Sequence, residues 1–194
     1  MRENRGMWFR GRRRSIYEAN LIASFLPYRE YKDVAVEDLR YALGEVYIIA
    51  TRMNVIFARA SYEDPLELRR RLERRLPEDT PVLRVIPVMR IVPAEVEDVK
   101  KAVHSLLATQ KPGSFAIRLE ARLLREGREI PRMEAVKIIA EGVNRSVDLG
   151  RPDILVLIKP FRLREGRLAA IYVGPPDGVF SSLKRGGERV GGER

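Results

Sequence analysis

Apolar and polar residues alternate in short blocks along the first half of the chain, and each block predicts a strand or a helix. Met7–Phe9 is expected to form a short strand. Ser15-Ile16-Tyr17-Glu18 has the arrangement of a capping box, so we predict a helix over Ile16–Leu26 that ends before the following proline. Val46–Ala50 and Val55–Ala60 are β-rich runs separated by a turn, which indicates a hairpin.

A second helix and a long extended run complete this half. Asp64-Pro65 places an acid and a proline at a helix start, and leucines then recur every four residues from Leu68 to Leu76. Val82–Val92 is apolar, with Pro87 indicating an edge position or a bulge because proline cannot donate to the ladder. The resulting β-α-β-β-α-β order predicts a ferredoxin-like arrangement.

The second half shows the same mixture of helical and strand periodicities. Val96, Val99, Val103 and Leu106 mark one face of an amphipathic helix. From Phe115 to Leu123 the side chains alternate between apolar and charged, as in a half-buried strand. We further predict a polar turn, a helix opened by proline with four apolar residues inward, an apolar strand and a final strand: Arg125–Arg128, Pro131 with Met133, Val136, Ala140 and Val143, Ile154–Ile158, and Leu168–Val173.

These elements predict an α+β protein of two domains. The first, a ferredoxin-like domain, is expected over residues 1–92, and the second over residues 93–183. Residues 184–194 contain the repeated tetrapeptide Gly-Gly-Glu-Arg and lack apolar anchors, so we expect a disordered tail there.

The composition restricts the available chemistry. Cysteine is absent and only one histidine is present, which argues against thiolate and imidazole metal sites, and no Asp/Glu spacing specifies a magnesium site. No Gly-x-Gly-x-x-Gly loop or nucleophile–base pair is evident, so we expect no cofactor and no catalysis by the chain alone. No stretch approaches the roughly 18 apolar residues of a membrane span, and a soluble cytoplasmic protein is expected.

The charge balance indicates a polyanionic partner. The 194 residues carry a formal charge of +10, and 30 of the 37 basic residues are arginine, whose planar donor fork suits phosphate. The competing interpretation is a thermophilic protein whose surface carries dense Arg/Glu networks.

Candidate nucleic-acid contacts cluster in the second half. Glu120, Glu126 and Glu129 are interleaved with them, so an ion-paired surface is the alternative. The candidates comprise two strand arginines, three arginines in and after the polar turn, two basic residues assigned to the next helix, one loop arginine and the N-terminal arginine run: Arg118, Arg122, Arg125, Arg128, Arg132, Lys137, Arg145, Arg151, Arg12, Arg13 and Arg14.

The order of motifs from Ser114 to Val173 resembles a THUMP domain, a module shared by tRNA thiolation, methylation and pseudouridylation enzymes. Ser114-Phe115-Ala116-Ile117 with Arg122 is similar to the first core strand of the family. Val147-Asp148-Leu149 followed by Arg151-Pro152-Asp153 is similar to its Val-Asp-Leu and Asn-Pro-Asp turn, with arginine where the family usually has asparagine or lysine.

The resemblance extends, through Leu83–Val88, to the stand-alone THUMP proteins of archaea and eukaryotes. It implies a tRNA-binding adaptor, without catalytic activity of its own, that presents the acceptor stem and 3′ end of tRNA to a separate tRNA cytidine N-acetyltransferase. Two alternatives stay open: a THUMP subunit of another tRNA-modifying enzyme, for thiolation or methylation, and a protein-interaction scaffold without RNA specificity.

Overall fold

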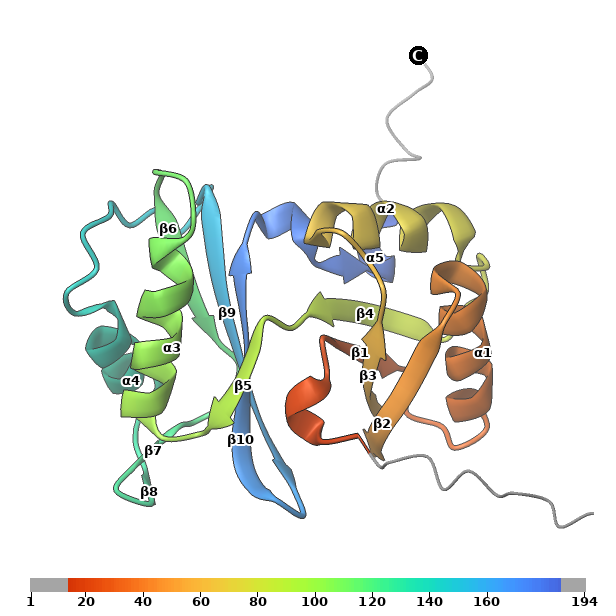
Figure 1. The fold of residues 1–194 in the computed structure, drawn as a ribbon, viewed down its shortest axis with the longest axis horizontal. Helices are drawn as coiled ribbons and strands as arrows, with labels where there is room; N and C mark the ends of the chain where they lie inside the picture. Colours follow the sequence, from red (N-terminus) through yellow and green to blue (C-terminus); the bar gives the residue numbers. More distant parts are fainter. Residues whose placement is uncertain (1–13, 186–194) are drawn as a thin grey trace, which may run out of the picture.

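The computed structural model describes residues 14–185, which form two large β-sheets, each with a pair of helices packed on its outer face, and one two-stranded hairpin (Figure 1). The first sheet has the strand order β11-β4-β1-β3-β2, and the second has the order β5-β10-β9-β6. The fold class is therefore α+β, as predicted.

The elements of the first sheet and its helices are β1 (Leu21–Phe25), α1 (Tyr31–Leu43), β2 (Val46–Arg52), β3 (Val55–Ala60), α2 (Pro65–Arg75), β4 (Val82–Pro87) and β11 (Phe180–Ser181). Those of the second are β5 (Arg90–Pro93), α3 (Val96–Ala108), β6 (Phe115–Leu119), α4 (Arg132–Ala140), β9 (Ile154–Leu163) and β10 (Gly166–Gly174). The hairpin of β7 (Leu124–Arg125) and β8 (Arg128–Glu129), the 3-10 turns η1 (Ile16–Glu18) and η2 (Pro176–Gly178), and α5 (Ser182–Arg185) complete the described chain.

The β-α-β-β-α-β order is confirmed, but its first two elements are not the ones predicted. Met7–Phe9 lies outside the described residues. The predicted helix over Ile16–Leu26 is wrong: the capping box is present, yet it closes only the 3-10 turn η1. Leu21–Phe25 is instead the central strand β1, because its alternate side chains pack on opposite faces of the sheet.

The long run Val82–Val92 is divided between the two sheets. β4 pairs with β1 and β5 pairs with β10, both antiparallel. At the other end of the chain, β11 returns to the first sheet and pairs with β4. These pairings cross the expected division at residue 92. Of the expected tail, α5 reaches Arg185 and the remainder lies outside the described residues.

The two sheets pack against each other through their inner faces. Along β10, Ala169 and Ile171 lie in the core beneath α3 and α4. Leu168 faces the other way and lies in one cluster with Ile22 and Phe57 of the first sheet. The strand is therefore buried on both sides, which explains its nearly continuous apolar sequence.

The inward face predicted for the helix after Pro131 is only partly confirmed. Val136, Ala140 and Val143 are partly buried and pack against the core, but Met133 is 67% exposed. The fully buried residues are Ala135 and Ile139. This stretch is apolar on more than one side, so its periodicity does not select a single face. Contact with α3 and β6 makes the choice.

A half-buried ion cluster joins the two sheets. Glu120 pairs with Lys159 of β9 at 2.9 Å and with Arg84 of β4. Burial alone would raise the pKa of the Glu120 carboxyl, but the hydrogen bonds from Lys159 and Arg84 outweigh burial and lower that pKa below its ordinary value. A carboxyl group whose pKa is lower in the folded than in the unfolded chain stabilises the fold at pH values above its unfolded-state pKa. This stabilisation is lost as the pH falls through the folded-state pKa.

Within residues 14–185, no helix is both long and apolar enough to cross a membrane. The same residues contain no cluster of three or more His, Cys, Asp or Glu side chains placed to hold a metal ion.

Candidate nucleic-acid interface

Two hairpins share the same arginine-containing turn sequence. Arg-Glu-Gly-Arg occupies residues 125–128 between β7 and β8, and again residues 164–167 between β9 and β10. In the first turn Glu126 and Gly127 both have positive φ, of 51° and 76°, as a tight two-residue hairpin turn requires. Each turn is therefore flanked by arginines at the tip of a two-stranded ribbon.

A shared carboxylate brings the two hairpins together. Glu129 of β8 pairs with Arg167 of β10 at 2.7 Å and with Arg122 at 3.8 Å. Figure 1 shows both hairpin ends at the lower end of the molecule as drawn. We call their six arginines the twin-hairpin surface: Arg122, Arg125, Arg128, Arg162, Arg164 and Arg167.

The twin-hairpin surface carries excess positive charge. Three glutamates, Glu126, Glu129 and Glu165, accompany the six guanidinium groups. Arg125 pairs with Glu134 at 3.7 Å, but its side chain is 56% exposed, and such a solvated pair is weak. Among residues 14–185, Arg128, Arg162 and Arg164 form no ion pair and are exposed, so their donor forks are available to a ligand.

Sequence reasoning identified only half of this surface. Arg122, Arg125 and Arg128 were candidates, whereas Arg162, Arg164 and Arg167 were not. The signal was present in the chain, because the tetrapeptide Arg-Glu-Gly-Arg occurs twice. Their proximity was not readable, since it depends on an ion pair between residues 38 positions apart.

The other candidates in the second half lie elsewhere. Arg132 and Lys137 are exposed on α4, and Arg132 follows directly after the first hairpin. Arg118 is aligned with Leu157 in the parallel β6–β9 pair, and Leu157 faces the first sheet. Arg118 therefore lies on the opposite face of β6 from α4. Arg151 is exposed in the loop before β9, near the first residue of β6.

Arg145 has a structural role in this structure. It lies in the loop after α4, not on a helix as expected. Its two terminal nitrogens donate to the carbonyl oxygens of Leu107, Gln110 and Lys111 at 2.7–3.0 Å, and to that of Gly113 at 3.4 Å. These carbonyls end α3 and follow it, where a cation is favoured. We therefore leave Arg145 out of the twin-hairpin surface.

Replacing Arg145 with alanine is expected to lower the free energy of unfolding by about 2 kcal/mol, because carbonyls at the end of α3 lose a charged donor. Arg145→Lys should recover little, since one ammonium cannot reach carbonyls that a planar fork bridges. Urea titration of both variants measures this. Wild-type stability in Arg145→Ala would contradict the structural role.

The turn before β9 is tied through Asp153 to the residue that precedes β6. The Asp153 carboxylate accepts from the backbone N–H of Ser114 at 2.8 Å and from its hydroxyl at 2.9 Å. The backbone bond, followed by the hydroxyl bond, lowers the pKa of Asp153. A side chain at Gly113 would place its Cβ 2.8 Å from that of Asp153, so the approach requires glycine. An open cavity of about 640 Å³ borders this turn.

The single histidine is half-buried between two helices. The Nε2 of His104 lies 2.9 Å from the carbonyl oxygen of Ile139. It joins α3 to α4.

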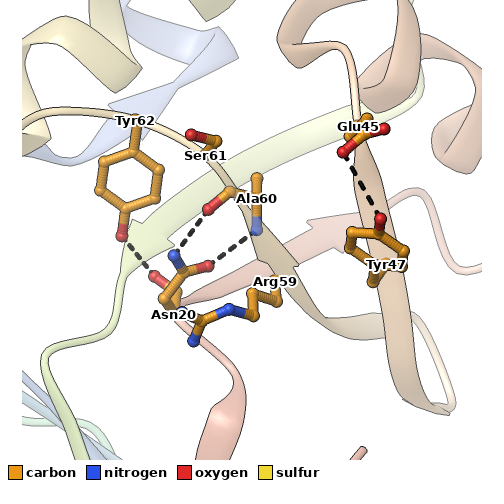
Figure 2. A pocket seen from close by; sticks show the side chains of 7 residues that line it. All are labelled: Asn20, Glu45, Tyr47, Arg59, Ala60, Ser61 and Tyr62. Carbon is orange, nitrogen blue, oxygen red and sulfur yellow. Dashed lines mark hydrogen bonds between the residues drawn. The ribbon is translucent and has the colours of Figure 1, made fainter.

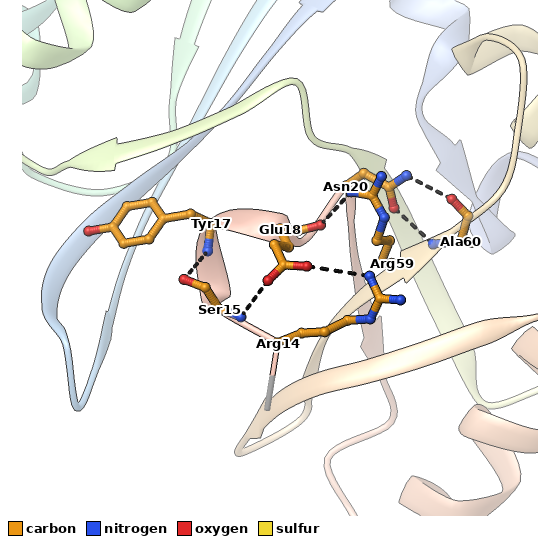
Figure 3. A network of polar contacts seen from close by, with 7 residues as sticks. All are labelled: Arg14, Ser15, Tyr17, Glu18, Asn20, Arg59 and Ala60. Carbon is orange, nitrogen blue, oxygen red and sulfur yellow. Dashed lines mark hydrogen bonds and ion pairs between the residues drawn. The ribbon is translucent and has the colours of Figure 1, made fainter. Parts of the chain in front are cut away.

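The N-terminal arginines are only partly described. Arg12 and Arg13 lie outside the described residues. Arg14 pairs with Glu18 at 3.3 Å, and its guanidinium carbon lies 4.5 Å from the centre of the Tyr47 ring. Figure 3 shows this Arg14–Glu18 contact beside Arg59, which donates to the Glu18 carbonyl at 3.1 Å.

Several residues that line a neighbouring pocket of about 360 Å³ hydrogen-bond to one another (Figure 2). The Asn20 side chain donates to the Ala60 carbonyl and accepts from the Ala60 N–H. Tyr62 donates its hydroxyl proton to the Asn20 carbonyl at 2.5 Å, and burial raises the pKa of Tyr62 to about 12. These polar groups hold β1, β3 and the chain after β3 together.

The chain is similar in sequence to part of a protein named as a probable tRNA-modifying enzyme. No family model matches it. Over 139 residues it is 28% identical to a protein of Nocardia farcinica (strain IFM 10152) named "Probable tRNA sulfurtransferase", a match that covers 66% of this chain and 32% of that protein. The chain therefore spans about a third of the length of this relative.

Solved structures with a similar fold have low sequence identity. PH1313 of Pyrococcus horikoshii Ot3 superposes with a TM-score of 0.52 and 16% identity, over 81% of this chain and 55% of that one. This likeness shows the fold alone. A 4-thiouridine synthetase, solved as an RNA complex with bound ATP, gives a TM-score of 0.49 and 14% identity, over 81% of this chain and 42% of that one.

The sequence match corrects one expectation. The interpretation as a non-catalytic partner of a separate enzyme is wrong, because the matched relative is itself named as an enzyme. The match also gives no support to acetylation, since the name of the relative specifies sulfur transfer.

Proposed function

We propose that this chain is the RNA-binding part of a tRNA-modifying enzyme and holds tRNA on the twin-hairpin surface. The observation that carries the proposal is the pair of Arg-Glu-Gly-Arg hairpins held side by side through Glu129. Three exposed guanidinium groups of this surface have no acidic partner among the described residues. The THUMP-like motifs and the tRNA sulfurtransferase relative support RNA, and tRNA in particular, as the polyanion.

The proposed recognition reads the shape of the RNA backbone. A guanidinium group offers two parallel N–H donors to a phosphate, and its charge does not titrate in the physiological range. The deep, narrow major groove of A-form RNA admits few side chains, so folded RNA is held mostly through phosphates and 2′-hydroxyls. Two arginine-tipped hairpins are suited to grip a phosphate chain without reading its sequence.

For the reaction, we propose sulfur transfer to a tRNA nucleotide. The support is the name of the relative, and it favours thiolation over acetylation. Mass spectrometry of tRNA nucleosides from cells lacking the coding sequence would test this class. Loss of a thiolated nucleoside is the expected result, and loss of an acetylated one with all thiolated nucleosides intact would overturn it.

RNA binding is tested by fluorescence anisotropy with labelled tRNA at increasing salt. If all six arginines of the twin-hairpin surface meet phosphates, the logarithm of the association constant should fall against the logarithm of salt concentration with a slope of about −4 to −5. A slope near zero, or no binding at low salt, would rule out this surface as a phosphate grip.

A further inference from the structure

A small apolar pocket lies where the β1–α1 loop meets the β2–β3 turn. Its volume is about 280 Å³. The backbone N–H of Phe25 donates to the Asn54 carbonyl, and the Asn54 side chain donates to the Phe25 carbonyl, both at 3.0 Å, so the two segments are joined at the pocket. We call this the Tyr28 pocket, and it is lined by Phe25, Pro27, Tyr28, Arg29, Lys32, Met53 and Asn54.

Two large apolar side chains at its mouth face solvent. The Tyr28 side chain is 58% exposed, and its ring meets the Tyr31 ring edge to face at 5.9 Å, which restrains it. Met53 is 86% exposed and adopts a φ of 51°, a left-handed conformation that is unfavourable for residues other than glycine. An exposed ring beside an exposed thioether offers a flat ligand one face for stacking and a second apolar contact.

Positive charge surrounds this apolar centre. Arg29 and Lys32 both line the pocket and are exposed. Within residues 14–185 neither forms an ion pair, although Glu30 and Asp33 are adjacent in sequence. A ligand with a flat apolar part and an attached anion satisfies both halves of the pocket. A nucleotide has this composition.

The Tyr28 pocket continues the twin-hairpin surface. Arg52, the last residue of β2, donates to the carbonyl oxygen of Arg162 in the second hairpin, and Met53 follows it. Figure 1 shows the β2–β3, β9–β10 and β7–β8 turns at the same end of the molecule. An RNA backbone lying across the two arginine hairpins therefore passes close to the mouth of the pocket.

We propose that the Tyr28 pocket binds one unstacked nucleotide of the RNA, with the base against the Tyr28 ring and the phosphate beside Arg29 and Lys32. This inference rests on the proposed function, because it needs RNA on the twin-hairpin surface. It adds a requirement that the twin-hairpin surface does not impose: the RNA must contain an unpaired nucleotide.

The test uses an RNA hairpin with a blunt end and the same hairpin with a single-stranded extension carrying 2-aminopurine. Wild-type protein should bind the extended RNA more tightly and quench the 2-aminopurine. Tyr28→Ala should weaken binding of the extended RNA about ten-fold and leave the blunt RNA unchanged, because stacking on one aromatic ring is lost. Tyr28→Phe should keep wild-type affinity, and Tyr41→Ala, which removes a tyrosine that is 72% exposed on α1, is the matched control.

A double substitution tests the same site independently, in case the Tyr28→Ala variant does not fold. Arg29→Gln with Lys32→Gln should reduce the salt slope for the extended RNA by about 1 to 2 and leave that for the blunt RNA unchanged. Two results would overturn the proposed nucleotide site but not the proposed function. One is a Tyr28→Ala variant that binds both RNAs as tightly as the wild-type protein does; the other is a wild-type protein that binds the two RNAs equally tightly. Failure of the wild-type protein to bind either RNA would overturn the proposed function together with it.

Discussion

Replacing Arg125, Arg128 and Arg164 together with glutamine should weaken tRNA binding roughly 100-fold at physiological salt. These three residues lie in the two Arg-Glu-Gly-Arg turns, and each is exposed. Each phosphate contact that is lost should also reduce the slope of log K against log salt by about 1. Anisotropy titrations of wild type and variant over a salt series measure both quantities.

The control removes the same charge from another part of the molecule. Arg70, Arg74 and Arg75 are exposed on α2, which Figure 1 shows at the upper end, away from the hairpins. Their replacement with glutamine should leave most of the affinity and the slope intact. Equal losses in the two triple variants would mean that net charge, and not the twin-hairpin surface, holds the RNA.

Gly178→Ala should lower the free energy of unfolding by about 3–5 kcal/mol, more than Arg145→Ala does, which corresponds to roughly a 10 °C drop in Tm for a chain of this size. A Cβ at Gly178 would collide with the Tyr172 hydroxyl and lie 2.8 Å from the Cβ of Pro65. Tyr172 cannot move easily, because it is fully buried and donates to the Pro175 carbonyl at 2.7 Å. The new methyl group would therefore strain the contact between α2 and η2, which leads into β11.

Calorimetry of Gly178→Ala beside Gly150→Ala checks this prediction. The nearest atom to a Cβ at Gly150 is the Asp148 Oδ1 at 3.6 Å, an ordinary contact, so that variant should unfold near the wild-type temperature. If Gly178→Ala melts with the control, the packing around Tyr172 is looser than the structure describes.

Local signals in the sequence were reliable where one short segment decides its own conformation. The capping box at Ser15–Glu18 forms, α2 begins at the proline after Asp64, and Leu68 and Leu72 face the core. These features depend on hydrogen bonds and periodicity that neighbouring residues supply.

Where the sequence allows two arrangements, the prediction from the sequence is wrong or only partly right. Leu21–Phe25 follows a capping box and suits a helix, yet it becomes the central strand because β3 and β4 pair with its two edges. On α4, apolar residues occur on several sides: Val136 and Ala140 pack against the core as predicted, but the fully buried pair is Ala135 and Ile139. In both cases burial against distant residues outweighs the local preference.

The candidate interface likewise depends partly on the sequence and partly on the tertiary structure. The amino-acid order already contains the excess of arginine, the α+β class, the β-α-β-β-α-β order and both Arg-Glu-Gly-Arg turns. Only the tertiary structure brings Glu129 to Arg167 and Arg52 to Arg162, and it commits the guanidinium group of Arg145 to the carbonyls that follow α3. Charge and turn propensity are properties of residues and their near neighbours, whereas a surface is made by residues that packing brings together from distant parts of the chain.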